Sequence, residues 1–190
     1  MKKTLTLIST IILTTCSSAQ SNTEIVQKYM RLEMGGSTDE LAELLTDDLV
    51  VVFEDGVEMD KQSVSSNHDF NIPYNPWNKI IFLEELNDST IKIHALETNE
   101  LNQIFKIDTI AYAHQFTLTD SRISKIEIGI IPNSGYNYGA SDSIYNSKLA
   151  ELFDWMSLVY PKEFEQIDGL NSKSAEIILK KAKEKEDNNH

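Results

Sequence analysis

Apolar residues recur along this chain at two different spacings, and the change from one to the other outlines the expected fold. Over residues 24–45 they recur every three to four positions, which predicts amphipathic helices. Ser21 and Glu24 have the spacing of a capping box at a helix start. Ser37 and Glu40 repeat that spacing after a pair of glycines. The chain is therefore expected to open with two short helices.

Strand-like patterns follow these helices. Residues 49–53 form a β-branched run typical of a buried strand, and Asp55-Gly56 after it predicts a tight turn. Asp60 is placed to cap a third, weaker helix, and the two prolines in residues 71–78 exclude regular structure there. Short polar turns join the later segments in pairs, which predicts antiparallel hairpins. These segments are residues 79–86, 90–98, 106–118 and 122–131.

The last fifty residues return to helical spacing. Residues 141–160 carry an apolar stripe that Pro161 interrupts, and a further helix is expected over residues 172–185. We therefore expect an α+β domain over residues 21–140, followed by a C-terminal helical extension over residues 141–190.

The order of these elements resembles the NTF2-like superfamily, the cone-shaped fold shared by nuclear transport factor 2, SnoaL-like cyclases and ketosteroid isomerases. The resemblance is carried by EIVQKYMRLEMGGSTDELAELLTDDLVVVFEDG, residues 24–56, and extends over about residues 22–131. It implies a curved antiparallel sheet that wraps around the N-terminal helices and leaves a cavity. It implies no single function, because this fold carries catalysts, binders and scaffolds alike.

The first twenty residues have the features of an export signal. Lys2 and Lys3 precede an apolar segment, residues 5–13, that is far shorter than the ~20 residues needed to span a bilayer. Cys16 follows in a setting that resembles a bacterial lipobox, so cleavage before Cys16 and lipidation of its thiol are expected. Ordinary cleavage after Gln20 is the alternative. The expected location is the cell envelope, as an outer-membrane lipoprotein, or otherwise the periplasm or the exterior.

Composition narrows the set of partners. The chain carries 30 acidic and 17 basic residues, a formal net charge of −13, so phosphates and anionic headgroups would repel it. We expect no nucleic-acid partner, and membrane contact only through the lipid anchor. A single cysteine and four scattered histidines match no metal-binding spacing, and phosphate- and dinucleotide-binding motifs are missing. We therefore expect neither a metal nor a cofactor.

Two residues are candidates for catalysis. Alternation along residues 106–118 places Tyr112 and His114 on the more apolar face, toward the cavity, where a histidine is either a general base or a hydrogen-bonded core residue. Tyr29 lies where the resemblance to ketosteroid isomerases implies a tyrosine that stabilises an enolate oxygen; simple helix packing is its alternative role. The carboxylate base of such an enzyme would come from the first strand, where alternation turns Phe53 inward.

Aromatic residues in two polar loops are candidates for ligand binding. Tyr74 and Trp77 lie in the first loop and Tyr136 in the second, and both loops are expected at the cavity mouth. Tyr74 and Trp77 could instead plug the open end of the sheet. Tyr112 and His114 complete the predicted ligand-binding set.

These patterns favour an exported, non-catalytic protein that binds a small apolar or amphipathic ligand or serves as an envelope interaction module. A homodimer through the outer face of the sheet fits the resemblance. The alternative function is a small isomerase or cyclase that uses Tyr29 and His114.

Overall fold

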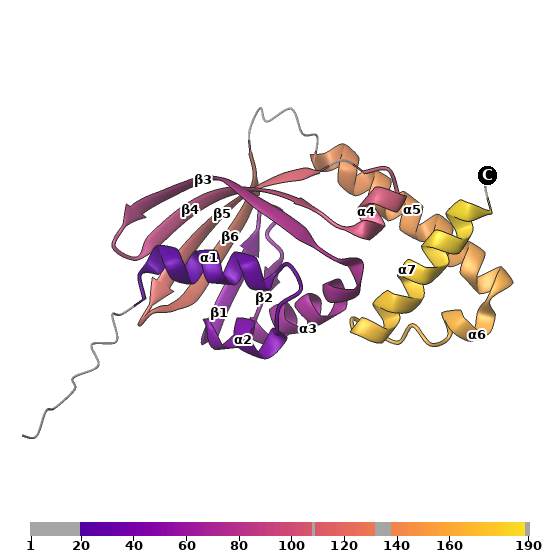
Figure 1. Ribbon diagram of the computed structural model, residues 1–190, viewed down its shortest axis with the longest axis horizontal. Coiled ribbons are helices and arrows are strands. Elements are labelled where there is room, and N and C mark those ends of the chain that lie inside the picture. The colour runs from indigo at the N-terminus through magenta and orange to yellow at the C-terminus, as the bar shows by residue number, and fades with distance from the viewer. Residues whose placement is uncertain (1–19, 108, 132–137, 189–190) are drawn as a thin grey trace, which may run out of the picture.

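Within the described residues, six strands form one sheet that curves over the N-terminal helices (Figure 1). The structure, a computed structural model, describes residues 20–107, 109–131 and 138–188. The strands are β1 (Leu45–Phe53), β2 (Glu58–Met59), β3 (Trp77–Asn87), β4 (Thr90–Thr98), β5 (Ile110–Thr119) and β6 (Arg122–Ile130). The helices are α1 (Asn22–Leu32), α2 (Thr38–Glu43), α3 (Lys61–Asn71), the 3-10 helix η1 (Ile72–Tyr74), α4 (Glu100–Ile104), α5 (Tyr138–Val159), α6 (Pro161–Phe164) and α7 (Ser172–Asp187).

The strand order is β2-β1-β6-β5-β4-β3. Strands β3 to β6 form the predicted antiparallel meander, in which neighbouring strands are joined in sequence. Strand β1 pairs with β6 in the parallel direction, so the sheet is mixed rather than wholly antiparallel. The predicted α+β class, with a curved sheet around N-terminal helices and a helical C-terminal end, is confirmed.

Side-chain caps begin the first three helices where the sequence predicts them. Ser21 and Glu24 form a complete capping box: Ser21 Oγ accepts from the Glu24 N–H, and Glu24 Oε2 accepts from the Ser21 N–H. At the starts of α2 and α3, the side chains of Ser37 and Asp60 accept from the N–H groups of Glu40 and Ser63. Gly35, at φ +99°, supplies the left-handed backbone that lets the chain reverse after α1.

The strand expected over residues 106–118 begins only at Ile110, because helix α4 and a turn occupy the preceding segment. Asn99 Oδ1 accepts a hydrogen bond from the Asn102 N–H at 2.8 Å and starts this helix. Lys106, in the left-handed region at φ 59°, follows it. A helix of one turn is too short to show a helical period in the sequence.

Residues 71–78 were expected to be irregular, but η1 and the start of β3 lie within them. Proline is tolerated in the first turn of a helix, and Pro73 occupies that place in η1. Pro76 directly precedes β3, where Trp77 already pairs with Thr98.

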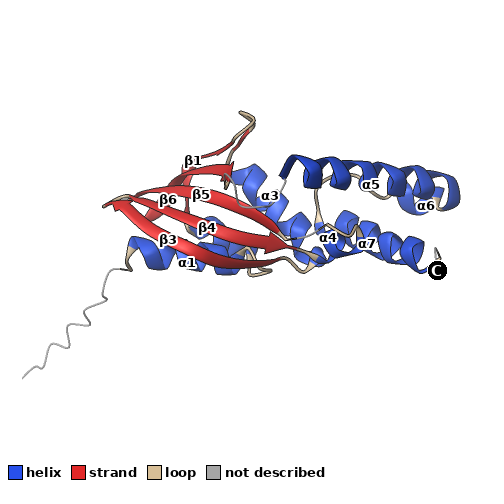
Figure 2. Ribbon diagram, turned by 90° about the horizontal axis from the view of Figure 1, so that it is seen from above, coloured by secondary structure: helices blue, strands red, loops and turns tan. Residues whose placement is uncertain are grey.

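Two hydrophobic clusters hold the fold together. The larger one lies between the concave face of the sheet and helices α1 to α3, where Tyr29 packs edge-on against the fully buried Phe116 at 5.6 Å between ring centroids. The second joins η1 and α4 to α5 and α7, with Leu101, Leu152 and Met156 at its centre. Figures 1 and 2 show α5, α6 and α7 beyond the end of the sheet that lies next to α3 and α4.

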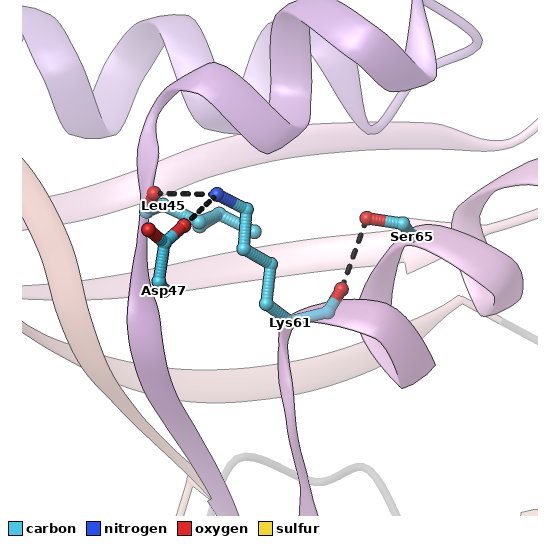
Figure 3. A network of polar contacts seen from close by, with 4 residues as sticks. All are labelled: Leu45, Asp47, Lys61 and Ser65. Carbon is cyan, nitrogen blue, oxygen red and sulfur yellow. Dashed lines mark hydrogen bonds and ion pairs between the residues drawn. The ribbon is translucent and has the colours of Figure 1, made fainter.

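Lys61 ties the start of α3 to β1 (Figure 3). Its ammonium group donates to the Leu45 carbonyl at 3.2 Å and to Asp47 Oδ1 at 2.9 Å. The hydrogen bond to Asp47 and the positive charge of Lys61 lower the pKa of the exposed Asp47 carboxyl. Ser65 Oγ donates to the Lys61 carbonyl at 2.9 Å in the first turn of α3. The contact matters for the site because α3 supplies one wall of the cavity described below.

None of the helices in the described part of the chain is long and apolar enough to cross a bilayer. Cys16 and the predicted export signal lie outside the described residues, as does Tyr136.

Replacing Phe116 by alanine should lower the free energy of unfolding by about 3–5 kcal/mol, because it leaves a cavity in the main core. Phe82→Ala is the matched control, since Phe82 lies on the outer face against His94 and is 42% exposed. Phe82→Ala should lower the free energy of unfolding by less than about 1 kcal/mol. Urea unfolding measures both; equal losses would contradict the assignment of the two sheet faces.

Candidate functional site

A cavity of about 320 Å³ lies between the concave face of the sheet and helices α1, α3 and α4. This volume is at the lower end of the range for small-molecule sites, about 300–1,000 Å³. Apolar side chains from the strands, among them Val51, Phe53 and Ile128, form one part of its lining. Ionisable and amide side chains form the rest, so the cavity is amphipathic.

A histidine–glutamate pair lies on the strand side of this cavity. His114 Nε2 and Glu97 Oε1 are 2.8 Å apart, and His114 is buried. The register of β4 and β5 pairs Ala95 with Tyr112, which lie between these two residues along the strands. The His114 ring lies against Phe116 and Tyr112, with ring centroids 5.9 and 6.0 Å away. The imidazole therefore has a fixed orientation.

The charges around His114 favour its protonated form. Burial by itself would lower the pKa of His114, but the hydrogen bond with Glu97 and the negative charges of Glu97 and Glu33 outweigh it. The pKa of His114 is accordingly raised above its ordinary value of 6.5. The cavity therefore favours the imidazolium form of His114 more than water does.

Glu33 and Tyr29 face this pair from α1. Burial and the charge of Glu97 raise the pKa of Glu33 to about 7, although His114 and a hydrogen bond with Tyr29 act in the opposite direction. Burial and the neighbouring Glu33 raise the pKa of Tyr29 well above 10. Tyr29 is therefore a neutral phenol, whereas Glu33 gains and loses a proton close to neutral pH.

Together these four side chains form a proton-transfer cluster, defined here as Tyr29, Glu33, Glu97 and His114. Two carboxyl groups in one site resist ionising together, which keeps a proton available to the cluster. A general acid or base works best when its pKa is near the working pH, and the pKa of Glu33 meets that condition. Shifted pKa values of this kind, in a cavity, are a feature of catalytic sites.

A second histidine in the cavity wall has a structural role. His68 Nε2 lies 2.9 Å from the Leu32 carbonyl, to which it must donate, and its Nδ1 therefore accepts from Thr38 Oγ1 at 2.8 Å. Both ring nitrogens are occupied in joining α3 to α1 and α2. The adjacent Asp69 turns away and accepts from the Ser172 N–H at 3.3 Å.

Among the residues that the structure describes, no group of three or more histidine, cysteine, aspartate or glutamate side chains is arranged to hold a metal ion.

No protein-family model matches the sequence, and none of the curated proteins matches it. Solved structures do match the fold. A protein from Kribbella flavida assigned as a ketosteroid isomerase superposes with a TM-score of 0.50 at 11% identity, over 61% of this chain and 82% of that one. A second Kribbella flavida protein gives 0.50 at 11% identity, over 65% and 95%. This chain has the NTF2-like fold.

An NTF2-like protein of unknown function from Cytophaga hutchinsonii is also similar, with a TM-score of 0.49 at 9% identity, over 60% of this chain and 95% of that one. Identities this low show the fold alone, so the chemistry of this chain has to be argued from its own residues.

Four of the predicted site residues line the NTF2-like cavity: Tyr29, Trp77, Tyr112 and His114. Tyr74 does not, which corrects its expected place at the cavity mouth. It is 1% exposed in the second hydrophobic cluster, with its ring edge-on to Phe70 at 5.4 Å. The reason is η1, which turns Tyr74 toward α7 rather than toward the sheet.

Phe53 lines the cavity, as alternation along β1 predicts, whereas Glu54 lines a groove on the outer face with Val52 and Gly129. The first strand thus supplies no carboxylate to the cavity. The carboxyl groups come from α1 and β4 instead, as Glu33 and Glu97.

Sequence reasoning missed Glu33 and Glu97, although each carried a signal. Glu33 follows Tyr29 by four residues and is the C-cap of α1, so its side chain continues the helix face that carries Tyr29. Glu97 continues the inward alternation of Ile91, Ile93 and Ala95 along β4. A carboxylate at an inward-facing position is costly to bury, and that cost marks it as a candidate functional group.

The Glu33→Gln variant should remove the contribution of Glu33 to the pH dependence of the free energy of unfolding. A raised pKa in the folded state stabilises the protein below the unfolded pKa of about 4.5, and this stabilisation is lost as the pH rises through about 7. Relative to the parent, Glu33→Gln should therefore gain about 2.5 kcal/mol of unfolding free energy between pH 5 and pH 8.

Urea unfolding at both pH values measures this difference. Glu43→Gln, an exposed change on α2, is the matched control and should show no pH-dependent difference. Parallel stability curves for Glu33→Gln and the parent would contradict the raised pKa of Glu33.

Proposed function

We propose that this NTF2-like protein binds a small molecule in its cavity and transfers a proton to and from a carbon atom of that molecule, as isomerases and cyclases do. The observation that carries the proposal is the proton-transfer cluster, in which Glu33 titrates near neutral pH beside a buried His114–Glu97 pair. The fold comparisons support a ligand cavity of this kind but extend no further.

The chemistry we propose is abstraction of a proton from a carbon next to a carbonyl group. Ionised Glu33 takes the proton as the carbon–hydrogen bond breaks. The electron pair moves to the carbonyl oxygen, which becomes an enolate. The Tyr29 hydroxyl and the positive charge of His114 stabilise that oxygen, and Glu33 then returns its proton to the same carbon or to a conjugated one. Stabilisation of an oxyanion by fixed donors in a cavity is a large contribution to catalysis.

Glu97 acts through His114 in this scheme. Its hydrogen bond to Nε2 fixes the orientation of the imidazole and favours its protonated form. It is a positioning residue, whereas Glu33, Tyr29 and His114 face the reacting atoms.

A non-catalytic binder, the function favoured by the sequence patterns, would use the same cavity without turnover. The amphipathic lining is compatible with either role, so turnover is the observation that separates them. We further propose that the protein works in the cell envelope, on the basis of the export signal that the sequence predicts over its first twenty residues. The lipid anchor at Cys16 and the homodimer remain predictions.

Exchange of carbon-bound protons with deuterium oxide tests this function directly. The probes are cyclohexanone, cyclohex-2-enone, 2-hydroxycyclohexanone and dihydroxyacetone, followed by proton NMR. The parent protein should accelerate exchange beside the carbonyl of at least one probe, and Glu33→Gln should lose about 10²–10⁴-fold of that acceleration.

Tyr29→Phe should lose about 10²-fold, because it removes one donor to the enolate oxygen. Glu43→Gln should keep the parent rate. If none of the four ketones exchanges faster with the parent protein than without it, the proton-transfer proposal fails and the non-catalytic binder is the better account.

A further inference from the structure

Helices α3 and α4 line the cavity with side-chain amides, and one of these belongs to a largely buried residue whose amide opens only into the cavity and makes no hydrogen bond to another described residue. Asn102 on α4 lines the cavity and is 8% exposed. Its N–H donates to Asn99 Oδ1 at 2.8 Å, and its carbonyl accepts from the Ile107 N–H at 2.9 Å. Within the described part of the chain its side-chain amide makes no hydrogen bond. A bound molecule that covers this amide without pairing with it would leave a buried unsatisfied group, at a cost of about 1–3 kcal/mol, whereas a molecule with a hydroxyl there avoids that cost.

Other asparagines around the cavity separate into two kinds. Asn99 caps α4 and Asn78 donates to the Met30 carbonyl at 2.7 Å, so both serve the fold. Asn67 and Asn71 lie four residues apart on α3 and therefore share one helix face, which lines the cavity. Neither side chain is used in a hydrogen bond to another described residue. The helical wall thus offers three amides, each both donor and acceptor, to a ligand.

Trp77 adds an aromatic surface to this wall. It lines the cavity from the first residue of β3 and is 45% exposed, so part of its ring is open to a ligand. An aromatic face next to hydrogen-bonding groups suits a ring that carries hydroxyls on its edge and C–H bonds on its face.

The charges exclude an anionic ligand. Glu33 and Glu97 line the cavity, whereas none of the lining side chains in the described parts of the chain is a lysine or an arginine. Among the described residues of this lining, the positive charge favoured at His114 is already paired with Glu97. A carboxylate or phosphate would therefore meet like charge with no cation to bind it.

We propose that the cavity binds a neutral, hydroxyl-rich molecule of about the size of a monosaccharide or a cyclic polyol. Asn102, Asn71 and Asn67 bind its hydroxyls, and Trp77 packs against its ring. This inference rests on the proposed function of the site and names its substrate class, a neutral hydroxylated carbonyl compound. It departs from the apolar ligand that the sequence favoured, because an apolar molecule would leave the Asn102 amide unpaired.

Ligand-observed NMR tests the proposal with D-fructose, myo-inositol, cyclohexanol and D-glucuronate as probes. The parent protein should bind D-fructose or myo-inositol at least about tenfold more tightly than cyclohexanol, and D-glucuronate more weakly than either. Asn102→Leu should lower the affinity for the hydroxylated probe about tenfold and leave the affinity for cyclohexanol unchanged. Gln103→Leu, an exposed change at the next residue of α4, is the matched control and should bind as the parent does.

A thermal melt shows whether Asn102→Leu is folded. If it is not, Asn71→Leu, at a half-buried position on α3, replaces it in the same binding experiment. Tighter binding of cyclohexanol or D-glucuronate than of both neutral hydroxylated probes would overturn the inference. The inference would also be overturned if neither D-fructose nor myo-inositol binds. It would be overturned as well if the folded Asn102→Leu or Asn71→Leu variant binds the hydroxylated probe as tightly as the parent does.

The ketone exchange experiment keeps the two proposals distinct. Exchange of cyclohexanone but not of 2-hydroxycyclohexanone or dihydroxyacetone would leave proton transfer standing and overturn the hydroxylated substrate class. Binding of D-fructose or myo-inositol without exchange of any ketone would overturn proton transfer and leave the binding class standing.

Discussion

The packing of α1 into the concave face of the sheet is the interaction on which the other features depend. Ile25, Val26 and Met30 are almost fully buried there, and Tyr29 lies against Phe116 in the same interface. The helix face that makes this core continues into the cavity, where its next turn places Glu33 beside the His114–Glu97 pair. Stability and chemistry therefore share one helix face: core packing fixes the position of a carboxyl group that would prefer water.

The C-terminal helices support the opposite wall of the cavity. Helix α7 packs against α3, η1 and α4, and the Ser172 N–H at its start donates to Asp69 on α3. Helices α3 and α4 carry the amide side chains that we assign to ligand binding. We propose that residues 141–190 hold this wall in place from behind, which gives the extension a role in positioning the cavity wall.

The sequence was informative wherever a local rule decides the outcome. Capping residues placed the starts of α1 to α3, and alternation placed His114, Phe53 and His94 on the correct sheet faces. It was uninformative where distant segments meet. The parallel pairing of β1 with β6, the turn of Tyr74 toward α7 and the meeting of Glu33 with Glu97 depend on tertiary contacts that no local pattern encodes. The short helix α4, which carries Asn102, has too few residues for a periodic signal.

Carbon-13 NMR of the glutamate side-chain carboxyl groups, followed from pH 4 to pH 9, tests the central claim that the fold holds an ionisable carboxyl group ready for proton transfer. Assignment rests on the signal that Glu33→Gln removes. The account predicts that this signal titrates with a midpoint near 7, and that the midpoint falls when Glu97→Gln removes the neighbouring charge. A midpoint near the ordinary value of about 4.5, unchanged by Glu97→Gln, would contradict it.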